Sequence, residues 1–83
     1  MKRTVTWSHE AVEDLFDLTV RDQKLARRIM ITVRGFGMGQ RTDLKKLSGQ
    51  RTWRLRAGDW RVILLLDGDE ATVESIDNRR DAY

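Results

Sequence analysis

The hairpin sequence WRLRAGDWRV, residues 53–62, constrains the fold of this chain more than any other stretch. Apolar and basic residues alternate on both sides of Gly58-Asp59, which is typical of two β-strands that bury one face. Glycine at the first position of that pair predicts a two-residue turn of type II′. Such a turn pairs Arg56 with Arg61 across the strands, and like charges placed opposite each other cost stability. The pattern therefore favours a function that needs clustered guanidinium groups.

The register of this hairpin assigns every side chain to one of two faces. The apolar face should form the core under the helices, and it carries Trp53, Leu55, Val62, Leu64 and, from the last strand, Val73. The opposite face carries Arg54, Arg56 and Arg61 beside Ile63 and Leu65, and we expect Glu74 to share it. Several fixed guanidinium forks on one surface suit phosphate binding. The structural alternative is an open sheet face whose apolar residues are covered by long basic side chains.

The residues before the hairpin predict one strand and two helices. The β-branched and aromatic residues 4–7 predict the strand. Ser8 is a suitable N-cap for a helix over about 9–18. Asp22 is a candidate cap for a second helix, and the sequence leaves open whether residues 19–21 continue the first. The glycine-rich segment 35–39 ends the second helix, and it does not predict a phosphate-binding loop because no Lys-Ser/Thr pair follows it.

The residues after the hairpin predict a second tight turn and a last strand. Asp67-Gly68 predicts a turn of type I′, and residues 71–76 predict the strand. The segment 45–49 before the hairpin is polar and predicts only an approach to it. The element order is thus β-α-α-β-β-β, an α+β fold with an antiparallel sheet and a two-helix hairpin on one face. The chain length allows a single domain, residues 1–83.

Composition favours a globular protein of the cytoplasm. Hydrophobic residues make up 40% of the chain and charged residues 35%, which differs from the composition of disordered chains. The absence of cysteine gives no indication of secretion. The longest apolar run, residues 62–66, is far shorter than a membrane span, and no signal-peptide pattern opens the chain. We therefore expect no membrane partner.

The formal net charge of +3 is distributed unevenly along the chain. Residues 1–23 carry three basic and five acidic side chains, and residues 62–83 carry two basic and six acidic ones. The central block, residues 24–61, carries eleven basic and two acidic side chains, a formal charge of +9. Such a block favours nucleic acid or an acidic protein as a partner.

The C-terminal segment NRRDAY, residues 78–83, places two arginines near a terminal tyrosine. A flat aromatic ring beside arginines can stack on a base while the arginines hold the phosphate backbone. A charged, frayed terminus is the alternative for this segment taken alone.

Three segments together resemble the RelE/ParE superfamily of bacterial toxin–antitoxin toxins. They are the basic approach LKKLSG at residues 44–49, the hairpin WRLRAGDWRVI at 53–63 and the C-terminal NRRDAY. The resemblance implies a β-α-α-β-β-β fold and an antitoxin that wraps and blocks the basic face. For the RelE branch it implies cleavage of mRNA on the ribosome, in which the 2′-hydroxyl of the substrate attacks the adjacent phosphate. This reaction needs no metal and no cofactor.

The resemblance also implies roles for particular residues. Arg54, Arg61, Arg79 and Tyr83 match catalytic positions: Arg61 stabilises the scissile phosphate, and Tyr83 stacks on or activates the RNA. Lys45, Lys46, Arg56 and Arg80 are expected to bind RNA. Two positions differ from the family pattern, since Thr52 replaces a basic residue and Asn78 replaces a histidine. Catalysis would then depend on positioning and electrostatics, because arginine is a poor base.

Two other functions remain open from the sequence. The first is a ParE-type toxin that poisons DNA gyrase by binding it. The second is a small RNA-binding or degenerate toxin domain without turnover, for which tight and salt-sensitive RNA binding is the expected sign.

Overall fold

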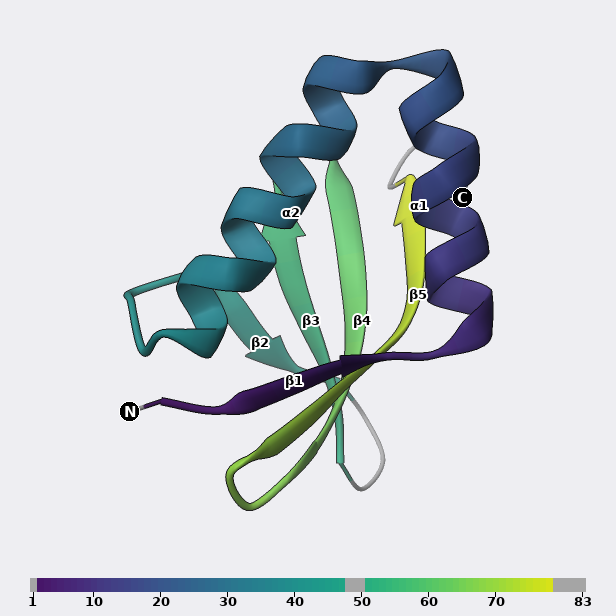
Figure 1. Ribbon diagram of the computed structural model, residues 1–83. Coiled ribbons are helices and arrows are strands. Elements are labelled where there is room, and N and C mark those ends of the chain that lie inside the picture. Colours follow the sequence, from purple (N-terminus) through teal and green to yellow (C-terminus); the bar gives the residue numbers. More distant parts are fainter. Residues whose placement is uncertain (1, 48–50, 79–83) are drawn as a thin grey trace.

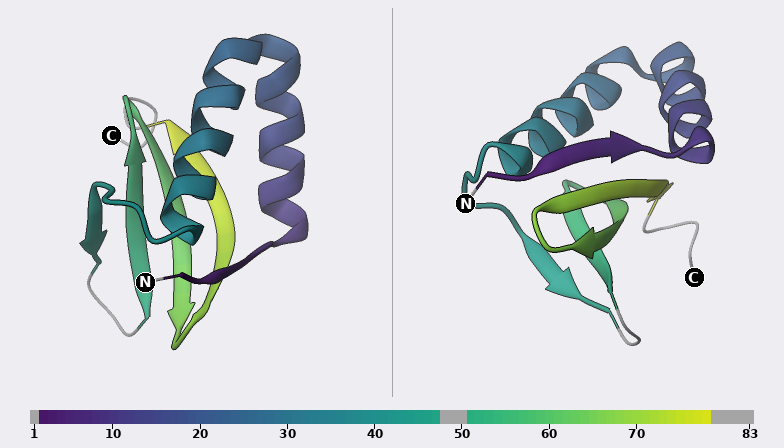
Figure 2. Two further views of the ribbon diagram at one scale, coloured as in Figure 1. Left: turned by 60° about the vertical axis from the view of Figure 1, so that its left-hand side comes forward. Right: turned by 60° about the horizontal axis from the view of Figure 1, so that its bottom comes forward.

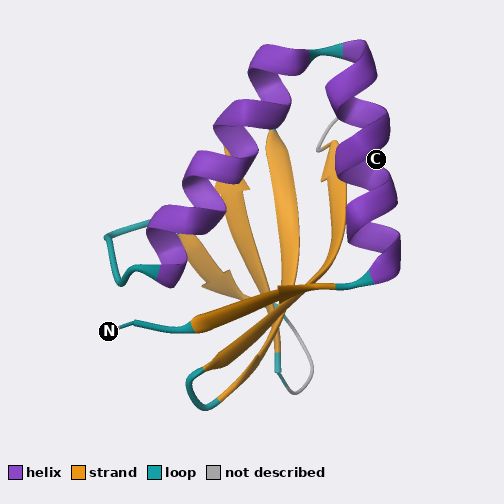
Figure 3. Ribbon diagram, in the orientation of Figure 1, coloured by secondary structure: helices purple, strands orange, loops and turns teal. Residues whose placement is uncertain are grey.

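A computed structural model describes residues 2–47 and 51–78 as two layers, a sheet and a helix pair (Figure 1). Five strands form one sheet in the order β1-β5-β4-β3-β2. Both helices cover the same face of it, and no described helix lies on the other face (Figures 2 and 3). In chain order the elements are β1 (Thr4–Trp7), α1 (His9–Arg21), α2 (Gln23–Gly37), β2 (Leu44–Lys46), β3 (Thr52–Ala57), β4 (Trp60–Asp67) and β5 (Glu70–Asn78).

The sheet is mixed, so the expectation of a purely antiparallel sheet is wrong. β1 pairs with β5 in parallel, with Val5 opposite Ala71, whereas the other strand pairs are antiparallel. The segment expected to be a polar approach also forms an additional edge strand, β2, which pairs with β3. The parallel pairing depends on a partner distant in sequence, and β2 has only 3 residues, too few for local periodicity to identify.

Side-chain caps set the starts of both helices. The Ser8 hydroxyl accepts a hydrogen bond from the Ala11 amide at 3.0 Å, and the Asp22 carboxylate accepts one from the Leu25 amide at 3.2 Å. Both predicted caps are therefore confirmed, and residues 19–21 continue the first helix. In the part of the chain that the structure describes, no helix has the length and apolar character needed to cross a membrane.

The core lies between the helix pair and the sheet. Its largest fully buried side chains come from α2 and the central strands, and the faces predicted for the hairpin are confirmed by their burial. Trp53 is only partly buried and packs at the edge of this core. The largest fully buried residues are Phe36, Ile29, Leu55, Leu64, Val62 and Val73.

The two tight turns both begin at a glycine with positive φ. Gly58 has φ +63° and Gly68 has φ +60°, and no described non-glycine residue has positive φ. This matches type II′, in which only the first turn residue needs that conformation. The type II′ prediction at Gly58-Asp59 is confirmed. The second turn is Gly68-Asp69, one residue later than predicted and not type I′, because Asp67 pairs with Glu70.

Replacing Gly68 with alanine should lower the free energy of unfolding by about 1–2 kcal/mol, because an L-residue is strained at positive φ. No other atom lies within 4 Å of the added Cβ position, so the backbone alone sets this cost. Asp69→Ala, at the adjacent turn position with negative φ, should change the free energy by no more than about 0.5 kcal/mol. Urea unfolding of both variants measures the difference, and equal costs would contradict the assigned turn.

Candidate nucleic-acid interface

The sheet face opposite the helices, called the open face below, collects basic side chains from β2, β3 and β4. Arg56 pairs with Arg61, and Arg54 pairs with Lys45 on one side and Ile63 on the other. Directly paired residues share a face, and the alternate positions next to the arginines, Leu55, Ala57 and Val62, are buried on the helix side. The structure therefore places Lys45, Arg54, Arg56 and Arg61 on one surface.

All three arginines of the hairpin are partly buried on this face. Only 19% of the Arg54 side chain is exposed. Ile63 and Leu65 lie on the same face and are also partly buried, as expected if the aliphatic stems of the arginines cover them. Side chains held in this way lose less conformational freedom when they bind an anion than freely exposed ones do.

Two polar contacts orient the arginines of β3. Arg54 donates a hydrogen bond from Nη2 to Oδ1 of Asp43 at 3.1 Å. Arg56 donates from Nε to the carbonyl of Gly58 at 3.0 Å, which ties its guanidinium to the hairpin turn. The Nε of Arg54 is buried and has no hydrogen-bond partner among the described residues. A buried donor without an acceptor costs free energy, and a phosphate oxygen at this position would remove that cost.

Arg28 of α2 adds a further guanidinium beside the turn. Its Nη1 lies 3.3 Å from the position that a Cβ at Gly58 would occupy. Arg28 and this turn are thirty residues apart in the sequence, so no local pattern predicts that they lie side by side.

A β-bulge decides which carboxylate lies opposite Arg61. Leu64 pairs with Val73 but Ile63 pairs with Ser75, so Glu74 is the extra residue of β5. The expectation that Glu74 shares the face of the arginines stays a prediction, because Glu74 is exposed but has no partner opposite it on β4. The shifted register instead places Asp77 opposite Arg61.

Lys46 does not join the other predicted RNA-binding residues. It pairs with Trp53, a residue of the helix-side face, and its Nζ lies 6.0 Å from the centre of the Trp53 ring. Lys45, its neighbour, is on the open face because side chains alternate along a strand. The structure thus separates two lysines that the sequence analysis grouped.

Arg79, Arg80 and Tyr83, which were predicted from the C-terminal segment, lie outside the described residues. The preceding strand, β5, ends at Asn78 opposite Trp60, next to Arg61. The single histidine, His9, lies on α1 and pairs with Glu13 at 3.0 Å. It is on the helix side of the sheet, so it supplies no titrating base to the open face.

The central basic block is not one surface. Its helix residues, Lys24, Arg27, Arg28 and Arg34, belong to α2, whereas Lys45, Arg54, Arg56 and Arg61 lie on the open face. Apart from Arg28 at the turn, the sheet separates the two groups. A nucleic acid on the open face would therefore contact only part of the +9 charge.

The sequence matches no family model and no curated protein. Solved structures do match its fold. A chain of the RelB–RelE antitoxin–toxin complex from Methanococcus jannaschii superposes with a TM-score of 0.76 at 19% identity, over 94% of each chain. A chain of the RelE–RelB complex from Pyrococcus horikoshii gives a TM-score of 0.74 at 22% identity, over 95% of this chain and 97% of that one.

A chain of the YoeB–YefM complex from Staphylococcus aureus gives a TM-score of 0.70 at 17% identity, over 93% of this chain and 97% of that one. These likenesses cover almost the whole chain, so the protein has the fold found in these toxin–antitoxin complexes. The expected fold class is confirmed at this level, with the mixed five-stranded sheet as the correction.

Proposed function

We propose that this protein is the toxin of a toxin–antitoxin pair and that it cleaves mRNA on the open face. The observation that carries the proposal is the row of guanidinium groups, Arg54, Arg56 and Arg61, on a sheet face that no described helix covers. The fold it shares with chains of the RelE and YoeB complexes supports the same function.

The proposed reaction needs only groups of the RNA and of this chain. The 2′-hydroxyl oxygen attacks the adjacent phosphorus, the bond from phosphorus to the 5′-oxygen breaks, and a 2′,3′-cyclic phosphate and a 5′-hydroxyl form. The proton of the 2′-hydroxyl leaves to solvent or a nearby base, and the 5′-oxygen gains a proton. Arg61 and Arg54 stabilise the negative charge that grows on the phosphoryl oxygens. Arg79 and Tyr83 are proposed to complete the site from the C-terminal segment.

The missing histidine and the partly buried arginines together favour dependence on the ribosome. The described residues of the open face include no histidine, so the reaction is accelerated there mainly by holding the reacting atoms in line. Free RNA is flexible and seldom adopts that geometry, whereas a ribosome presents mRNA in a fixed shape. We therefore expect cleavage to be much faster for mRNA bound to ribosomes than for free mRNA.

The test is incubation of purified protein with ribosomes carrying a defined mRNA, followed by mapping of the new ends. New 5′-hydroxyl ends, each matched by a 2′,3′-cyclic phosphate end on the upstream fragment, are the expected result. Altered supercoiling by DNA gyrase without new RNA ends would overturn the proposal in favour of a ParE-type toxin. Tight, salt-sensitive RNA binding without cleavage would overturn it in favour of a binding domain.

The proposed partner is an antitoxin encoded by a neighbouring gene. The solved structures with this fold include complexes named for RelB and YefM antitoxins. Co-expression with the neighbouring gene product should relieve growth arrest and raise solubility. A gene without such a neighbour would contradict this part of the proposal.

Asp43→Asn should raise the affinity for RNA several-fold. The Asp43 carboxylate bonds Arg54 at 3.1 Å and so competes with phosphate for the same guanidinium. Removing its charge frees that group and increases the positive charge of the open face. Binding of a short single-stranded RNA, measured by fluorescence anisotropy at fixed salt, checks the prediction. Asp17→Asn, a change of equal charge on α1, should leave the affinity unchanged, and an equal rise in both variants would contradict a local effect.

A further inference from the structure

The outer surface of the two helices, called the helix face below, carries an unusual share of exposed apolar side chains. Six large hydrophobic residues of the described chain are at least half exposed, and all of them belong to the helix pair or its C-cap. Phe16 is 72% and Val20 74% exposed, although burial is the usual state of such residues. An apolar patch of this kind marks an interaction surface. The six are Val12, Phe16, Val20, Met30, Ile31 and Met38.

The two halves of the helix face have opposite charge. α1 contains four carboxylates and one arginine, a formal charge of −3 with its histidine neutral. α2 contains four basic residues and no acidic one, a formal charge of +4. Asp14 bonds the Ile76 amide of the sheet and Arg28 reaches the β3–β4 turn, so neither charge belongs to the helix face. The remaining side chains give a formal charge of −2 on α1 and +3 on α2, and each half carries three exposed apolar residues.

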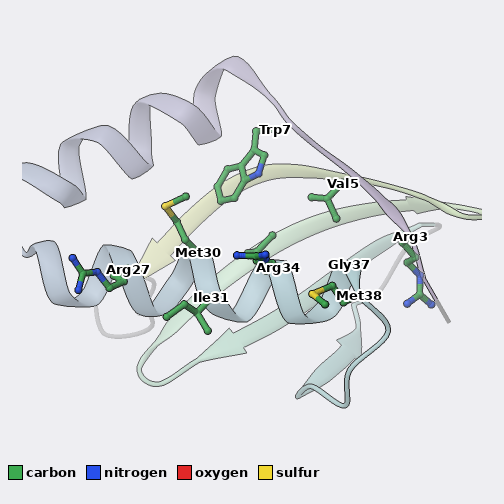
Figure 4. A pocket seen from close by; sticks show the side chains of 10 residues that line it. Arg3, Val5, Trp7, Arg27, Met30, Ile31, Arg34, Gly37 and Met38 are labelled. Carbon is green, nitrogen blue, oxygen red and sulfur yellow. The ribbon is translucent and has the colours of Figure 1, made fainter.

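The basic half also contains a groove. It lies between α2 and β1, has a volume of about 550 Å³, and is lined by Trp7, Val5 and Met30 among its apolar residues (Figure 4). Arg27 and Arg34 lie along it on α2. The groove is thus apolar in its lining and positively charged at its rim, which suits an aromatic side chain flanked by carboxylates.

We infer that the helix face binds a second copy of this chain in a symmetric dimer, with α1 of each copy against α2 of the other. A two-fold axis along the helix pair brings the acidic half of one copy onto the basic half of its partner, twice. The occupant follows from the charges, because the surface that complements the helix face is the helix face itself. In this arrangement Phe16 of each copy enters the groove of the other.

The position of Asp22 between the two helices predicts which charged side chains meet across the dimer interface. The helices run antiparallel from this residue, so Asp17 and Arg27, each five residues away, lie at a similar height. The two-fold axis then places Asp17 of one copy near Arg27 of the other. Within one copy Asp17 pairs with Arg21 at 3.0 Å, but the two side chains are 71% and 68% exposed. Exposed pairs of this kind are weak, so Asp17 can exchange that partner for an interfacial one.

The proposed dimer leaves the open face free, because the two faces lie on opposite sides of the sheet. Dimer formation and RNA cleavage can therefore be tested separately, and failure of one does not decide the other. The dimer also gives the basic residues of α2 a partner other than nucleic acid.

Sedimentation equilibrium of the purified full chain over a range of concentrations and salt tests the inference. The wild type should reach twice its 9.7 kDa mass and dissociate as salt rises. Phe16→Glu should weaken the dimer by about 30-fold or more, because it removes a central aromatic anchor and adds charge. Since Phe16 is exposed, this variant should retain its circular dichroism spectrum and its unfolding midpoint at low concentration.

Charge reversal separates this dimer from other arrangements. Asp17→Arg and Arg27→Asp should each weaken the dimer about tenfold, and the double variant should recover most of the wild-type affinity. Glu70→Arg, a reversal at the exposed first residue of β5, is the matched control and should leave the dimer unchanged. A monomer at all concentrations, or a dimer insensitive to Phe16→Glu, would overturn the inference. The inference would also be overturned if Asp17→Arg or Arg27→Asp left the dimer intact but abolished binding of a co-expressed antitoxin. The helix face would then bind the antitoxin and not a second copy.

Discussion

Arg61→Ala should lower the rate of ribosome-bound mRNA cleavage by about 10²- to 10³-fold, the usual loss when one preorganised charged donor is removed. Arg61 lies in the centre of the open face, opposite Arg56 on β3 and Asp77 on β5. In the proposed reaction, its guanidinium stabilises the negative charge that the phosphoryl group gains during attack by the 2′-hydroxyl. Single-turnover cleavage of mRNA on saturating ribosomes measures this step without a contribution from binding.

The controls for Arg61→Ala separate local chemistry from net charge and from folding. Lys24→Ala removes one positive charge from an exposed residue of α2 and should leave the rate unchanged. Arg61→Lys keeps the charge but loses the planar fork, so it should recover only part of the rate. Equal losses in Arg61→Ala and Lys24→Ala would show that the net charge matters and that the open face does not.

Leu64→Ala should lower the free energy of unfolding by about 2–5 kcal/mol, the usual cost of truncating a buried leucine. Leu64 is 0% exposed and lies in the core between β4 and the helices. Small domains are stabilised by only about 5–15 kcal/mol in total, so this single change should remove a large fraction of the stability. Urea unfolding followed by circular dichroism provides the measurement.

Leu65→Ala is the matched control for this prediction, because it makes the same chemical change one residue further along β4. Leu65 points to the open face and is only partly buried there. Its truncation should cost clearly less than that of Leu64, since the burial lost is smaller. If the two variants lost equal stability, the assignment of faces along β4 would be wrong, and the proposed RNA surface with it.

The two faces of this small protein divide its charge into two surfaces with different expected partners. The open face carries fixed guanidinium groups with few exposed apolar residues, which suits a phosphate backbone. The helix face combines apolar residues with charges of both signs, which suits a protein surface. Variants on one face should therefore affect cleavage and variants on the other should affect association, so the two proposals can fail independently.

The features that could be predicted from the sequence are those set by neighbours within a few residues. Glycine at the first turn position fixed the register of the β3–β4 hairpin, and that register assigned Arg54, Arg56 and Arg61 to one face. Ser8 and Asp22 marked the helix starts because a capping side chain bonds an amide only three residues away. Hydrophobic periodicity identified the buried sides of the strands in the same local way.

Other features of the site depend on contacts between distant segments, and only the tertiary structure decided them. The bulge at Glu74, which places Asp77 beside Arg61, lies directly after the part of β5 that also pairs with β1, whereas β4 pairs with β5 on both sides of the bulge. The approach of α2 to the hairpin brought Arg28 to Gly58. Turns and caps act over a few residues and leave a readable sequence signal. Strand order, bulges and the approach of helices to a sheet are set by packing across the whole chain, so they leave none.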